Sequence, residues 1–268
     1  MLFGICCEET ELDFSLYRID WIRQLVTLMD DSQAPVVQAS WVALDSFTKS
    51  IDKDEMETLV VPLRRTIESS GAPGRHVPGF GLPKGIAPML PIILAGLTNG
   101  SSEQREQAAY AIGDLVERTE ESALKPFTTQ LTGPLIRVIT QAATLPPAVK
   151  SAILSALTTM LDIVPTFVKP FFPQLQRTFC KSAADPASLV VRNRAAAALG
   201  SLFKSQTRVD PLITELVNGI RDSDDTIGAS LALALSNVVI NAAASISPAG
   251  RQVLKELIET SYSTSHEG

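Results

Sequence analysis

Hydrophobic and small residues recur along the chain with the spacing of one buried helical stripe. Offsets of 0, 4, 7, 8 and 11 residues place five side chains on one face of a helix with about 3.6 residues per turn. Five segments follow this pattern. At the fourth position of the pattern, where we expect burial, they carry Leu44, Ile112, Leu157, Leu199 and Leu235.

An earlier helix precedes four of these stripes, and each such helix carries a proline beside aliphatic residues. The prolines stand 38 to 43 residues apart, at Pro91, Pro134, Pro173 and Pro211. A period near forty residues is typical of HEAT or armadillo units, whereas tetratricopeptide and ankyrin units are shorter. Because proline removes one backbone donor, we expect it to start or kink each first helix. The pattern predicts an all-α protein, a HEAT-repeat α-solenoid without strands.

The same periodicity sets the expected unit boundaries. We expect a single array of antiparallel helix pairs with units at about 15–50, 53–119, 122–164, 168–206 and 209–243, then a partial unit at 248–260. Solenoids normally end in polar capping units. Because neither end of this chain shows one, we expect it to be a fragment of a longer solenoid.

One unit is longer than the others and contains a glycine- and proline-rich insertion at 71–83. We expect a helix near 54–69 before it and another near 84–98 after it. Insertions in repeat proteins often form the binding face, but a plain linker fits this composition equally well. We expect the insertion to be mobile or laid over the surface, so that deleting its middle would leave the melting temperature almost unchanged.

Two turns carry helix-start signals. Ser101 followed by Gln104 predicts a capping box, because the serine oxygen accepts a first-turn amide and the glutamine reaches back to the cap. Asp185 followed by Pro186 predicts a capping aspartate with proline at the first helical position. We therefore expect a helix to start at each of these two points.

Composition describes a chain with a large aliphatic core. The 268 residues are 45% hydrophobic but only 6% aromatic. The longest apolar stretches, such as 231–240, look too short and interrupted to span a bilayer, so we expect no membrane partner. The three cysteines, Cys6, Cys7 and Cys180, match neither a disulfide framework nor a zinc site. A reducing, intracellular setting is expected.

A search for catalytic motifs gives little. The segment 79–85 resembles a phosphate-binding loop but lacks its spacing, its Ser or Thr after lysine and a preceding strand. His76 and His266 have no cysteine or acid at ligand or triad spacing. We expect no catalytic residue, cofactor or metal, and no enzyme activity.

Charge argues against nucleic acid as a direct partner. The chain has 23 basic and 29 acidic residues and a net charge of −6, whereas phosphate binding needs a clustered positive field. A HEAT-type nucleic-acid enzyme is therefore the remotest alternative, because it would need a basic surface and a catalytic acid facing it.

Two arginines of one helix stand out when the five stripes are aligned. Arg105, Lys150 and Arg192 occupy the same position in three consecutive units, which is typical of an internal ladder that pairs with turn acids and neighbouring repeats. Arg194 is the one arginine in a column of small or neutral residues. Since stacking of the units does not require it, Arg194 is a candidate partner contact, with a solvated helix residue as the alternative.

Several longer strings resemble one particular HEAT family, the giant translational activator of general amino-acid control. They include Gly-Leu-Pro-Lys-Gly at 81–85, Gly-Ser-Ser-Glu-Gln-Arg-Glu-Gln-Ala-Ala at 100–109, Thr-Gly-Pro-Leu-Ile-Arg at 132–137, Lys-Pro-Phe-Phe-Pro-Gln-Leu-Gln at 169–176 and Val-Arg-Asn-Arg-Ala-Ala at 191–196. The resemblance covers roughly residues 80–240, with a weaker echo before them.

This resemblance implies a cytoplasmic, ribosome-associated scaffold in amino-acid starvation signalling. It places the chain in the C-terminal HEAT array, which binds the RWD domain of the kinase that phosphorylates the alpha subunit of initiation factor two. The family depends on an arginine in this region, which the resemblance places in the Arg-Asn-Arg string, at Arg192 or Arg194. Ribosome contacts are expected from other parts of the full-length protein. An adaptor for transport, phosphatase or tubulin partners is the alternative function.

Overall fold

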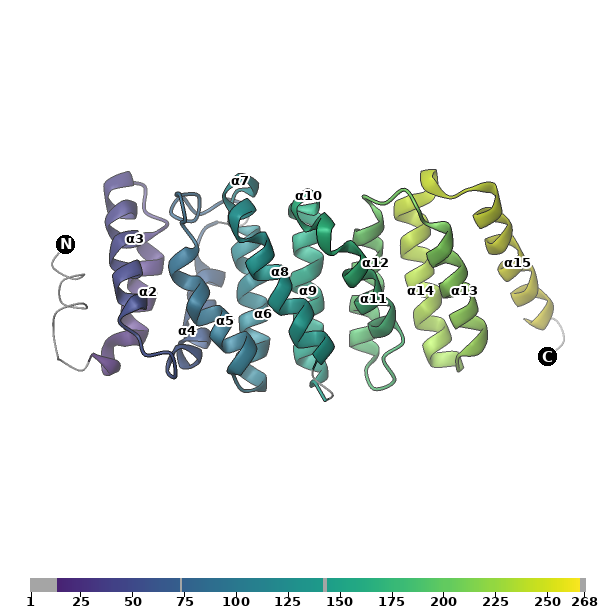
Figure 1. Ribbon diagram of the computed structural model, residues 1–268, viewed down its shortest axis with the longest axis horizontal. Helices are drawn as coiled ribbons and strands as arrows, with labels where there is room; N and C mark the ends of the chain where they lie inside the picture. Colours follow the sequence, from purple (N-terminus) through teal and green to yellow (C-terminus); the bar gives the residue numbers. More distant parts are fainter. Residues whose placement is uncertain (1–13, 73, 142–143, 266–268) are drawn as a thin grey trace. The chain divides into compact units, whose positions relative to one another are not determined.

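The computed structural model describes residues 14–72, 74–141 and 144–265, and this part of the chain is helical without strands. It forms two compact units, residues 1–168 and 169–268, which are described separately. The first unit contains α2 (Arg18–Leu28), α3 (Ala34–Lys49), α4 (Val60–Ser69), α5 (Leu90–Asn99), α6 (Ser102–Glu117), α8 (Thr128–Gln141) and α9 (Pro147–Ile163) (Figure 1).

Short elements join these helices. In the first unit they are η1 (Ser15–Tyr17), η2 (Met56–Leu59), η3 (Ala87–Met89), α7 (Glu121–Leu124), η4 (Lys125–Phe127) and α10 (Pro165–Val168). The second unit contains η5 (Lys169–Phe171), α11 (Phe172–Ala183), α12 (Leu189–Phe203), α13 (Asp210–Asp222), α14 (Asp225–Ala242), η6 (Ala243–Ser245) and α15 (Pro248–Ser265) (Figure 1).

The predicted stripes form the core. Leu44, Ile112, Leu157, Leu199 and Leu235 are all at most 5% exposed, which confirms that these faces are buried. In the first unit α6 packs along α9, and in the second α12 packs along α14. Alanines at 195, 196 and 198 are fully buried, and their small side chains allow this close approach. The stacking is that of a HEAT-type solenoid.

Three of the four prolines start their first helices, as predicted. Pro91, Pro173 and Pro211 stand in the first turn of α5, α11 and α13, where the missing amide would have had no helical partner. Pro134 lies inside α8, because a short 3-10 helix and an extra helical turn precede it. The capping box at Ser101 and Gln104 is also present. At Asp185 the prediction is wrong, since α12 starts only at Leu189 and its cap is Ser188.

The first two predicted units are arranged differently from our expectation. Helices α2, α4, α6 and α9 pack successively on one another, so α2 stands in the row of second helices. Helix α3 packs against α2 and also contacts η3, which leads directly into α5, and α5 packs against α8. The predicted units 15–50 and 53–119 therefore assign α3 to the wrong row. A buried stripe occurs on helices of both rows, so periodicity alone does not distinguish them.

Three residues anchor the glycine- and proline-rich insertion in the core, although most of its other described residues are exposed. The prediction of a mobile or surface segment is therefore wrong for residues 77–80. Val77 and Phe80 are 1% and 0% exposed. The amide of Val77 donates to the carbonyl of Arg118 at 2.9 Å, and that of Gly79 donates to the carbonyl of Met29 at 2.9 Å. These bonds attach the segment to the ends of α2 and α6. The composition correctly excluded helix and strand, but it does not report burial.

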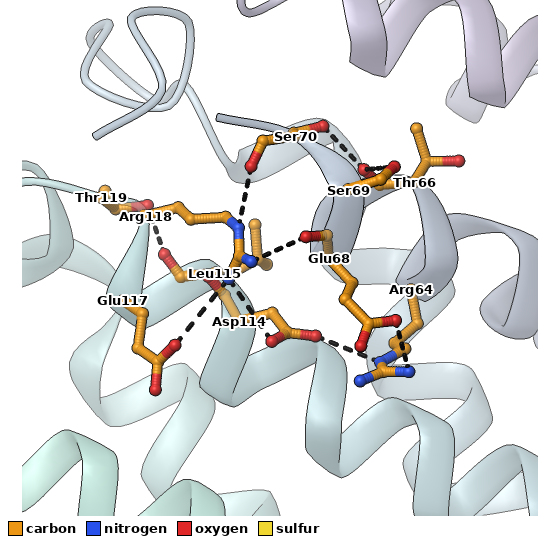
Figure 2. Close-up of polar contacts among 10 residues, drawn as sticks. All are labelled: Arg64, Thr66, Glu68, Ser69, Ser70, Asp114, Leu115, Glu117, Arg118 and Thr119. Carbon is orange, nitrogen blue, oxygen red and sulfur yellow. Dashed lines mark hydrogen bonds and ion pairs between the residues drawn. The ribbon is translucent and has the colours of Figure 1, made fainter. Parts of the chain in front are cut away.

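A polar cluster at the ends of α4 and α6 holds the two helices together (Figure 2). The guanidinium of Arg118 donates to the carbonyls of Ser70 at 3.0 Å and Glu68 at 2.8 Å, at the C-terminus of α4. Carbonyls there lack helical partners, and a cation complements the helix dipole. Asp114 contacts Arg64 at 3.1 Å and Arg118 at 3.4 Å. Burial raises the pKa of the Asp114 carboxyl despite the opposing attraction of both arginines.

We expect Arg118→Met to lower the free energy of unfolding by about 2 kcal/mol, because hydrogen bonds from a charged donor to two carbonyls are lost. Asp114→Asn should cost less, since burial already disfavours its charged form. Thermal unfolding of both variants tests this difference. A larger loss for Asp114→Asn would show that the carboxylate, not the capping of α4, holds the cluster together.

Candidate partner-binding surface

The start of α12 is fixed by its turn. The buried Asp185 carboxylate accepts the amides of Ala187 at 2.9 Å and Ser188 at 3.1 Å. The Ser188 hydroxyl in turn accepts the amide of Val191 at 3.3 Å. Because these bonds set the first turn, both candidate arginines project from a rigid helix rather than from a loop.

Arg192 lies inside the second unit. It is only 7% exposed, and its Nε donates to the Ser230 hydroxyl on α14 at 2.9 Å. One guanidinium Nη donates to the backbone carbonyl of Asp185 at 2.8 Å. Arg192 therefore joins the turn before α12 to the neighbouring helix α14, as expected for an internal ladder. The hydrogen bond that this Nη donates goes to a backbone carbonyl rather than to an acidic side chain.

Arg105 shows the same use of the repeated basic position in the first unit. Its guanidinium donates to the carbonyl of Thr98 at 3.2 Å. Thr98 precedes Arg105 by the same seven residues that separate Asp185 from Arg192. A basic residue at this position of two units thus bonds the second helix to a backbone carbonyl seven residues earlier in the chain.

We expect Arg192→Met to destabilise the second unit by about 2–4 kcal/mol, because two hydrogen bonds from a buried cation are lost. The melting temperature should fall by roughly 5–10 °C. Arg194→Met, on the same helix, is the matched control and should melt like the wild type. Equal melting temperatures for the two variants would contradict the internal role of Arg192.

Arg194 is exposed on α12 and, among the described residues, makes no hydrogen bond or ion pair. Two positions after Arg192, it lies about 200° further round the helix, on the solvent side. Its guanidinium is therefore available to a partner. A planar guanidinium can pair with a carboxylate through two parallel hydrogen bonds.

Large apolar side chains are exposed on α12 and on α14. Leu189 and Val190 on α12 are 56% and 59% exposed, and Leu233 and Ile240 on α14 are 43% and 72% exposed. The two helices lie side by side (Figure 1). Periodicity did not predict these residues as a site, because they lie outside the stripe. The available signal was that α12 and α14 are apolar on more than one face.

Helix α14 has more apolar surface than packing uses. Residues 225–245 are long and apolar enough, by length and composition alone, to cross a membrane, which corrects the expectation that the stretch around 231–240 is too short and interrupted. Yet 39% of their most apolar window is buried within the fold. Leu231, Ala234, Leu235 and Val238 form the buried stripe. Leu233 and Ile240 lie outside this stripe and are exposed.

The described residues contain no group of His, Cys, Asp and Glu side chains that could hold a metal ion. His76 is exposed, while His266, Cys6 and Cys7 lie outside the described residues. Burial, together with Glu215, raises the pKa of the Cys180 thiol to about 12, which keeps it protonated and unreactive at neutral pH.

The fold defines a helical-repeat solenoid of the HEAT type. It resembles yeast importin-beta, with a TM-score of 0.57 and 14% identity over 91% of this chain and 32% of that one. It also resembles an engineered protein, with a TM-score of 0.54 and 16% identity over 88% of this chain and 98% of that one. These low identities establish the fold alone.

A family model described as stalled ribosome sensor GCN1-like, HEAT repeats, matches residues 1–84. The eIF-2-alpha kinase activator GCN1 of Saccharomyces cerevisiae is 38% identical over 94% of the chain. The stalled ribosome sensor GCN1 of Mus musculus is 37% identical over 96%, and that of Homo sapiens is 39% identical over 84%. Over most of its length the chain is thus similar to a segment of GCN1 proteins. It spans about a tenth of the length of these relatives.

Proposed function

We propose that this chain is a non-catalytic, cytoplasmic scaffold segment that binds the RWD domain of the initiation factor two alpha kinase. Binding would support activation of the kinase during amino-acid starvation. The names of the yeast and mouse relatives, a kinase activator and a stalled ribosome sensor, support this class of function. In this proposal ribosome contacts belong to other parts of the full-length protein.

The observation that carries the proposal is the contrast between the two arginines of α12. Arg192 makes its hydrogen bonds within the fold, whereas Arg194 is exposed and makes no ion pair among the described residues. We therefore assign the partner contact to Arg194 and a supporting role in stability to Arg192. An RWD domain that binds here should place an acidic group against the Arg194 guanidinium.

Charge near this site favours a protein partner over nucleic acid. Arg194 is a single cation on the exposed side of α12, and the start of α14 carries the acids Asp224 and Asp225. Hydrogen bonds from Thr226 and from the backbone of Ile227 lower the pKa of Asp224, so it is charged at neutral pH. A nucleic-acid backbone would need several clustered cations instead.

The test is a titration of the purified chain with the isolated RWD domain of the kinase. We expect saturable binding that weakens as salt rises, because an exposed ion pair is screened. The absence of binding by the wild-type chain would reject this function and favour another HEAT adaptor role.

A further inference from the structure

A groove runs between α12 and α14 at the apolar surface described above. It has a volume of about 360 Å³ and is lined mainly by Leu189 and Asn193 on α12 and by Thr226, Ala229 and Leu233 on α14. Its inner wall is the Arg192 side chain bonded to Ser230, whose hydroxyl also donates to the carbonyl of Thr226 at 3.2 Å. The accessible lining is therefore chiefly apolar.

The groove opens to solvent rather than enclosing a ligand. Small-molecule sites usually combine an enclosing shape with a few convergent polar groups. Here the inner polar groups bond to each other, so the groove has the character of a protein-docking surface. Exposed apolar patches of this kind commonly mark interaction sites.

Arg194 gives the docking surface its charge. Leu189 and Asn193 lie on the side of α12 that faces α14, whereas Arg194 lies further round the same exposed arc. A partner resting on α12 can therefore reach both the groove and the guanidinium. Its complementary surface must carry a carboxylate for Arg194 and an apolar group for the groove.

We propose that the groove between α12 and α14 receives a large apolar side chain of the RWD domain, beside the acidic group that pairs with Arg194. This inference rests on the proposed function and adds the chemistry that selects the partner. The ion pair orients the domain, and burial of the apolar side chain supplies affinity that salt does not screen. The partner surface is thus a mixed patch with one acidic and one large apolar side chain.

Two substitutions at exposed positions test the groove. Ala229→Trp fills it, and Leu233→Ser removes part of its apolar wall. Each should weaken RWD binding about tenfold at every salt concentration while leaving the melting temperature unchanged. The matched control is Ile258→Ser on α15, where Ile258 is 54% exposed and outside the groove; it should bind like the wild type.

The dependence of RWD affinity on salt concentration distinguishes the contribution of the groove from that of Arg194. The groove variants should keep the salt dependence of the wild type, whereas Arg194→Glu should lose it. Wild-type affinity in both groove variants, together with lost binding in Arg194→Glu, would overturn the groove and leave the proposed function standing. A wild-type chain that fails to bind the RWD domain would overturn both.

A membrane contact is the competing use of this apolar surface. The wild-type chain should not sediment with phosphatidylcholine vesicles. Sedimentation that is abolished by Leu233→Ser would overturn the proposal, because it would assign the groove and its rim to lipid.

Discussion

Phe80→Ala is expected to lower the free energy of unfolding by about 3–5 kcal/mol, the usual cost of truncating a fully buried phenylalanine. Phe80 is 0% exposed although it lies in a segment rich in glycine and proline. For a chain of this size the melting temperature should fall by roughly 10 °C. Thermal unfolding followed by circular dichroism measures the change.

The backbone of this segment cannot shift to fill the space left by Phe80 without a large cost in free energy. A Cβ atom added to Gly79 would stand 2.8 Å from the carbonyl oxygen and side chain of Met29, which shows how tightly the backbone passes the end of α2. The Trp41 indole also donates to the carbonyl of Lys84 at 3.1 Å. His76→Ala, at an exposed position of the same segment, is the control and should melt like the wild type. An unchanged melting temperature for Phe80→Ala would show that the segment contributes nothing to the fold.

Arg194→Glu is expected to weaken RWD binding by about 30-fold or more. A guanidinium paired at an interface centre contributes about 2 kcal/mol, and each 1.4 kcal/mol is a factor of ten in affinity. Reversal also places a carboxylate against the acidic group expected on the partner. Because Arg194 has no ion pair or hydrogen bond among the described residues, the melting temperature should not change.

Arg194→Lys distinguishes charge from geometry at this position. Lysine keeps the positive charge but lacks the planar fork of donors that matches a carboxylate. We therefore expect an intermediate affinity, measured by the same titration. Binding of Arg194→Lys as weak as that of Arg194→Glu would show that the bidentate geometry decides the contact, and full affinity of Arg194→Glu would reject the assignment.

The helical core could be predicted from the sequence because burial and periodicity are linked. Leu199 and Leu235 repeat at one position of a 3.6-residue pattern, and both are buried. The row to which α3 belongs could not be predicted in this way, because helices of either row bury one stripe. Phe80 was missed because its glycine-rich surroundings exclude regular elements without indicating whether the segment packs.

Part of the candidate site could also be predicted from the sequence, and part could not. Comparison of aligned repeat positions assigned different roles to Arg192 and Arg194, because a residue type that recurs at one position in several units is expected to stabilise the packing between units. The structure agrees on the internal place of Arg192 and on the exposure of Arg194. The sequence did not mark Leu233 as an exposed residue, because its neighbours in the sequence are apolar too. Only the packing of α12 on α14 decides which of these apolar side chains remain exposed to solvent.

The most direct test compares Arg192→Met and Arg194→Glu with the wild type in one calorimetric titration with the RWD domain, below the melting temperature of each variant. We predict that Arg192→Met melts at a lower temperature and weakens binding far less than Arg194→Glu does, because Arg192 only backs the groove, and that Arg194→Glu melts normally but loses binding by about 30-fold. Normal affinity in Arg194→Glu, or lost affinity with normal melting in Arg192→Met, would contradict the division of roles between the two arginines.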